Sequence, residues 1–183
     1  MNRTYFSAAS AVLILWSLPP AHGSSKPRDE APTTEAKNML EEIDAWSAGI
    51  ADTAFHLNEM AKSQRDPQAH LDGLAALRED VNRIGRYLQT LEAERDSLAA
   101  WEAKALDRAF PLMHEIADNA EKAILTYQSD RQRLWATPYV EETEKSSEEA
   151  NQVAAILHDY LKLAKTRDKE SRLEHSVSGS PGF

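Results

Sequence analysis

The sequence predicts an all-α protein, an elongated antiparallel four-helix bundle. Apolar residues recur in alternating steps of three and four positions through most of the chain, and this spacing is typical of a helix that packs its seam against a partner helix. No stretch alternates between apolar and polar residues with a period of two, so no strand is expected. Two capping residues that are each followed by proline mark sites where helices begin.

Residues 1–23 have the pattern of a secretory signal peptide. Arg3 precedes a short apolar run over residues 8–18, and Ala21 and Gly23 place small residues at the −3 and −1 positions of a cleavage site. The run is shorter than the roughly 20 residues of a transmembrane helix, so we expect cleavage rather than a membrane span. The predicted mature protein is secreted or periplasmic.

Two terminal segments lack large apolar runs and are rich in polar residues, proline or glycine. Residues 24–34 are predicted to form a disordered arm, and residues 174–183 a disordered tail. The helical bundle domain is therefore expected over residues 35–173.

The first two predicted helices have regular apolar seams. The first seam comprises Met39, Ile43, Trp46, Ile50, Thr53, Leu57 and Met60. Asp66 and Pro67 supply an N-cap and a first-turn proline for the second helix. The second seam comprises Leu74, Leu77, Val81, Ile84, Leu88, Leu91 and Leu98.

The polar residue Arg95 interrupts the second seam and predicts a turn at residues 95–97, where Asp96 or Ser97 is expected to cap a third helix. The third seam comprises Trp101, Ala105, Ala109, Leu112, Ile116, Ala120, Ile124 and Tyr127. Thr137 and Pro138 begin the fourth helix. Its seam comprises Ala150, Val153, Leu157, Leu161 and Ala164.

Four helices of about 30 residues each, joined by short turns, favour an up-down-up-down bundle. In this topology the acidic start of the first helix neighbours the basic end of the fourth. The acidic residues are Glu41, Glu42 and Asp44, and the basic residues are Lys162, Lys165, Arg167 and Lys169. The alternative is an open three-element array in which one continuous helix replaces helices two and three, and which has to dimerise to cover its apolar stripes.

Composition excludes several classes of function. The chain has no cysteine, which excludes disulfides, thiol catalysis, cysteine zinc sites and covalent haem attachment. The formal net charge is −9, and an acidic chain of this kind is not expected to bind nucleic acid.

The histidines of the bundle do not form a metal-binding pattern. His56, His114 and His158 fall on three different predicted helices, and no Glu-x-x-His pair of the kind found in di-iron bundles occurs. We therefore predict no metal site and no cofactor.

Met39 and His175 resemble the haem ligands of exported bundles of the cytochrome b562 kind, which lie near the start of the first helix and the end of the fourth. This resemblance implies a b-type haem-binding protein with Met39 and His175 as the cofactor-binding candidates. The seam pattern favours the simpler interpretation that Met39 is a core residue.

The segment from Leu74 to Leu98 resembles the first helix of AroQ-type chorismate mutases, some of which are exported. The resemblance implies that Arg78 and Arg95 are catalytic residues that bind substrate carboxylates. The lysine that the family carries about three turns later is replaced in register by Leu106.

Aromatic residues suggest how a protein partner is bound. Trp46 and Trp101 fall on seams and are expected in the core, whereas Trp135 and Tyr139 flank the predicted turn before the fourth helix. Exposed aromatic residues at a bundle end are suited to docking a partner, although packing over the loop is the simpler expectation. The sequence thus favours an exported, non-enzymatic protein of the cell envelope or exterior that acts by protein interaction, as a binding, scaffold or chaperone-like protein; a chorismate mutase-like enzyme and a haem protein are the alternatives.

Overall fold

The computed structural model of this chain describes residues 34–63 and 67–178, and it is all-α over these residues. Its helices are α1 (Thr34–Lys62), α2 (Pro67–Ala93), α3 (Ala100–Asp130) and α4 (Thr137–Ser178), with a 3-10 turn, η1 (Arg95–Ser97), between α2 and α3. The predicted signal peptide and residues 24–33 of the predicted arm lie outside the described residues.

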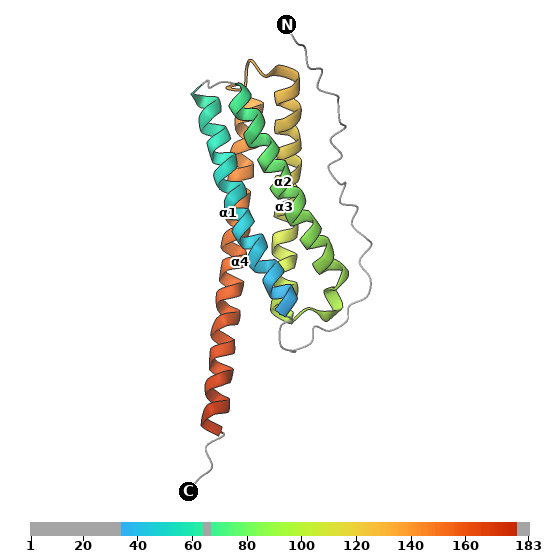
Figure 1. Cartoon of the computed structure of the whole chain (residues 1–183), viewed down its shortest axis with the longest axis vertical. Helices are drawn as coiled ribbons and strands as arrows, with labels where there is room; N and C mark the ends of the chain where they lie inside the picture. Colours follow the sequence, from blue (N-terminus) through green and yellow to red (C-terminus); the bar gives the residue numbers. More distant parts are fainter. Residues whose placement is uncertain (1–33, 64–66, 179–183) are drawn as a thin grey trace.

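The helices form the predicted four-helix bundle (Figure 1). Helix α1 packs against α2 and α4, and α3 packs against the same two helices, so that α2 and α4 lie diagonally across the bundle. The chain reverses direction at η1, which rules out the alternative with one continuous helix in place of α2 and α3.

The interior contains most of the predicted seam residues of α2, α3 and α4, but the seam of α1 is rotated. Ile43, Ile50 and Leu57 are buried as predicted. The other seam positions are only half-buried, namely Met39, Trp46, Thr53 and Met60. Small or polar residues one position later, Ser47, Ala54 and Ala61, are buried in their place. The prediction that Trp46 is a core residue was therefore wrong, while Trp101 is buried as expected.

This rotation lets α1 and α4 approach closely. Ala51, Ala54 and Ala150 are buried, and the hydroxyl of Ser147 donates a hydrogen bond across to the carbonyl of Ala51 at 2.9 Å. Large side chains at these positions hold helices apart, whereas small ones allow backbones to come together. The aromatic ring of Trp46 stacks at the edge of α1 on Tyr87 of α2, with ring centroids 5.0 Å apart.

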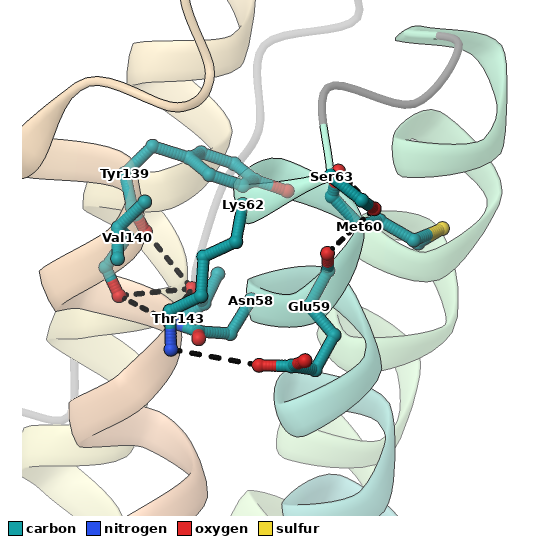
Figure 2. A network of polar contacts seen from close by, with 8 residues as sticks. All are labelled: Asn58, Glu59, Met60, Lys62, Ser63, Tyr139, Val140 and Thr143. Carbon is teal, nitrogen blue, oxygen red and sulfur yellow. Dashed lines mark hydrogen bonds and ion pairs between the residues drawn. The ribbon is translucent and has the colours of Figure 1, made fainter.

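A buried polar contact fixes the register of α1 against α4 (Figure 2). The side-chain amide of Asn58 donates to the carbonyl of Val140 at 2.7 Å and to the hydroxyl of Thr143 at 3.2 Å. Sliding either helix by one residue breaks both bonds and leaves a buried amide unpaired, at a cost of about 1–3 kcal/mol.

The joint between α2 and α3 differs in detail from the prediction. The cap of α3 is Ala99, not Asp96 or Ser97, and its backbone N–H donates to Glu102 Oε2 at 2.8 Å. Glu102 is fully buried, and burial raises the pKa of its carboxyl group. The sequence pattern predicted the turn correctly. It did not predict the cap, because the capping carboxyl group belongs to Glu102 within α3 and not to a residue that precedes the helix.

Helix α4 is longer than the roughly 30 residues predicted, with 42 residues, and its last turns extend beyond the other three helices (Figure 1). Lys165 Nζ lies 3.1 Å from Glu41 Oε1, which confirms that the acidic start of α1 adjoins the basic end of α4. The helix continues to Ser178, past residue 173, where the domain was predicted to end. Residues with high helix propensity, Lys169, Glu170, Arg172, Leu173 and Glu174, precede this end of the helix.

In the part of the chain that the structure describes, none of the helices combines the length and apolarity needed to span a bilayer.

Leu88 tests the core of the bundle, because its side chain is fully buried on α2. Leu88→Ala should lower the free energy of unfolding by about 2–5 kcal/mol through lost burial and the cavity left behind. The matched control is Leu125→Ala on α3, where the side chain is 55 % exposed and the expected change is under about 0.5 kcal/mol. Chemical denaturation followed by circular dichroism measures both, and similar costs at the two positions would contradict the observed packing.

Candidate functional site

A pocket lies at the end of the bundle where α1 ends, α2 begins and the α3–α4 connection runs, which is the upper end in Figure 1. Its volume is about 360 Å³, near the lower end of the range for small-molecule sites. The residues that line it are Ala61, Pro67, His70, Arg131, Gln132, Leu134 and Trp135.

The chain positions these residues through the ends of its helices. Pro67 begins α2 and places His70 in the first turn of that helix. Two backbone hydrogen bonds stabilise the turn that follows α3. The N–H of Arg133 donates to the carbonyl of Asp130 at 3.1 Å, and the N–H of Ala136 donates to the carbonyl of Arg133 at 2.9 Å. This turn buries Leu134 and leaves Trp135 48 % exposed at the pocket.

His70 and Tyr139 form a buried polar pair beneath the pocket. Both are almost fully buried, and His70 Nδ1 lies 2.9 Å from the Tyr139 hydroxyl. Because burial raises the pKa of Tyr139, the phenol keeps its proton. If the Tyr139 hydroxyl donates to Nδ1, only the Nε2–H of neutral His70 lacks a partner among the described residues, whereas the opposite direction leaves both the phenol proton and Nε2 without one. The first arrangement is therefore favoured, and it places the imidazole proton on Nε2.

The Nε2 atom of His70 is buried and has no hydrogen-bond partner among the residues that the structure describes. An unpaired buried donor of this kind costs free energy, so such a group points to an interaction that folding of the chain alone does not complete. Burial also lowers the pKa of His70, which keeps the ring neutral near pH 7.

The charges around the pocket favour an anion. The first turn of α2, which supplies Pro67 and His70, contains no acidic side chain, and the positive end of the helix dipole lies there. Asp130 is paired with Arg133, whose Nε donates to its Oδ2 at 2.7 Å. Arg131, which lines the pocket, makes no ion pair with another described residue.

The structure does not bring Arg78 and Arg95 together. Arg78 is exposed on α2, whereas Arg95 lies in η1. The rise per residue of an α-helix places the two about 25 Å apart along the chain. The guanidinium of Arg95 contacts Glu92 at 2.9 Å and also contacts Asp107. The long helix that the resemblance to chorismate mutases implies thus ends at Ala93, before the second arginine.

Met39 and His175 are also apart along the bundle. Met39 is half-buried against the core near the start of α1, where the neighbouring Lys37 pairs with Asp168 at 3.9 Å. The backbone of His175 lies two turns beyond Asp168, about 10 Å further along α4. The side chain of His175 lies outside the part that the structure describes.

The three histidines considered for a metal site occupy separate surfaces. His56 lies 3.4 Å from Asp52 within α1, and His158 of α4 lies 3.9 Å from Asp44; His114 is exposed on α3. Over residues 34–63 and 67–178, no three His, Asp or Glu side chains are grouped as metal ligands.

The sequence pattern indicated the Trp135 region as a candidate binding site, but it did not indicate His70. Trp135 is exposed as considered, whereas Tyr139 is buried. His70 precedes Leu74 by four residues and so continues the seam of α2 by one turn. This spacing, together with the adjacent Pro67, was the available signal for a buried histidine at the helix start.

Comparison with known proteins found no match: no family model, no curated protein and no solved structure is similar to this chain.

The buried pair predicts acid sensitivity of this end of the bundle. An unfolded histidine has a pKa of about 6.5, and burial lowers the pKa of His70 in the folded protein, so the unfolded chain binds the additional proton more readily. The free energy of unfolding should therefore fall as pH drops below about 6.5.

His70→Gln should reduce this loss, measured by denaturation at about pH 7 and about pH 5. His56→Gln, at an exposed histidine, is the control and should keep the wild-type slope. The buried Glu102 contributes in the opposite direction, because burial raises its pKa, and it contributes equally to all three proteins. Identical slopes for His70→Gln and the wild type would contradict a buried neutral histidine.

Proposed function

We propose that this chain is an exported binding protein that recognises a protein partner through the end of the bundle that carries Trp135, and that it acts by interaction rather than catalysis. The observation that carries the proposal is the exposure of Trp135, which is 48 % accessible beside a pocket. A large aromatic ring at the rim of a concave site is the kind of residue that dominates binding energy in interfaces.

The surrounding residues support this assignment. Leu134 is buried beneath the loop, and the backbone hydrogen bonds of residues 130–136 hold the connection in place. An anchor on a preorganised loop loses little conformational freedom on binding, which favours affinity.

Export is supported by the leader pattern of residues 1–23, in which Arg3 precedes a short apolar run and Ala21 and Gly23 place small residues before the cleavage site. Protein recovered from expressing cells should begin at Ser24 and should be found in the periplasm or medium, as determined by intact-mass spectrometry after fractionation. Recovery of the chain from the cytosol with residues 1–23 attached would contradict export.

A photo-crosslinking experiment tests the binding surface. The variant Trp135→p-benzoylphenylalanine, irradiated in the envelope fraction of the source organism, should give a discrete adduct that the other surfaces do not give. The matched control is Leu163→p-benzoylphenylalanine, a residue of similar exposure (45 %) on the distant half of α4. The same adducts from both positions, or none from position 135, would rule out this end as the docking surface.

A further inference from the structure

The pocket beside Trp135 has two hydrogen-bond donors for which the described residues supply no partner. The first is the buried Nε2–H of His70, a residue of the pocket lining, which has no partner among residues 34–63 and 67–178. Its role as a donor follows from the bond between the Tyr139 hydroxyl and Nδ1. What satisfies this atom has to be an acceptor.

The second donor is the guanidinium of Arg131. The two arginines of this loop differ: Arg133 is paired with Asp130 through contacts of 2.6 and 2.7 Å, while Arg131 faces the pocket without an ion pair among residues 34–63 and 67–178. Arginine binds carboxylates through two parallel hydrogen bonds, which makes an unpaired arginine at a pocket a specific feature.

The remaining wall is mainly apolar. Ala61, Pro67, Leu134 and Trp135 surround the polar groups, and Gln132 completes the lining. A volume of about 360 Å³ suits a group of the size of one amino-acid side chain with its carboxylate. None of the described lining residues is acidic.

We propose that this pocket binds the carboxylate of an apolar organic acid, with Arg131 and the Nε2–H of His70 as donors and Trp135 as the wall that covers the apolar group. The N-terminus of α2 at Pro67 adds to the favourable field for the anion. This inference deepens the proposed binding function and rests on it for the choice of this end of the bundle. The acid is either a free small molecule or the carboxyl terminus of a protein partner that ends in an apolar residue, and these two sources share the same chemistry.

Three probes distinguish the chemistry and its source. Phenylacetate represents a free acid, N-acetyl-Leu-Phe a peptide carboxyl terminus, and N-acetyl-Leu-Phe-amide the same peptide without the charge. Titration calorimetry on the full mature protein should show that a carboxylate binds at least about tenfold more tightly than the amide, because only the carboxylate pairs with Arg131. Tighter binding of the peptide acid than of phenylacetate identifies a partner terminus as the source, and the reverse order identifies a small acid.

Two arginine variants provide a matched pair for this test. Arg131→Gln should weaken binding of the carboxylate by about tenfold while leaving the amide unchanged. Arg133→Gln removes an equally exposed cation two residues away that does not line the pocket, and it should change the affinity by less than about twofold. Equal effects of the two variants would reduce the interaction to general surface charge and overturn the proposal.

Nitrogen NMR of the His70 ring gives a readout that does not depend on affinity. In the free protein the spectrum should show the proton on Nε2, and addition of the carboxylate probe should shift this nitrogen and slow the exchange of its proton. A proton on Nδ1, or binding of the amide as tight as that of the acid, would overturn the proposal.

The outcomes separate this inference from the proposed function. If no probe binds while photo-crosslinking at position 135 still gives its discrete adduct, the binding function stands and the carboxylate site is excluded. If neither position-specific adducts nor probe binding are found, both fail.

Discussion

The close contact between α1 and α4 is the constraint on which the rest of the bundle depends. Alanine and serine side chains at the contact bring the two backbones together, and Asn58 fixes how far one helix is shifted along the other. This shift determines where α4 begins relative to the end of α1. The geometry of the loop that enters α4, and of the pocket that this loop lines, therefore depends on buried small and polar residues more than one turn away.

The hydrogen bond between His70 and Tyr139 joins α2 and α4, which lie diagonally across the bundle. Diagonal helices in a four-helix bundle usually meet only through long side chains at the centre. Here the contact occurs at the end of the bundle and consists of two large rings, with centroids 5.3 Å apart in an edge-to-face arrangement. It closes the core beneath the pocket and holds one of the pocket's donors in a fixed orientation.

Periodicity predicted the four helices, the turn at residues 95–97 and the antiparallel order, because each depends on where apolar residues recur along one chain. It did not predict which face of α1 turns toward α4. A heptad pattern treats Trp46 and Ile43 alike, whereas close packing favours Ser47 and Ala54 over the large ring. That choice depends on the size of groups on a second helix, which no pattern within α1 reveals.

The candidate site was only partly predictable for a similar reason. Trp135 stood out because it follows the third seam and precedes a helix start, but the burial of Tyr139 depends on its contact with His70, 69 positions away in the sequence. Arg78 and Arg95 were selected by a pattern along the chain, and they lie apart because Arg78 is in the first half of α2 whereas Arg95 is in η1, after that helix ends.

The overhang of α4 has a consequence for how the molecule can be attached to anything else. The final turns of α4 lie at the opposite end of the long axis from the pocket, and the helix as a whole spans about 63 Å. A tether, surface or fused domain joined after α4 is therefore held away from the pocket by the full length of the rod. Immobilisation through that terminus leaves the pocket end of the bundle facing solution.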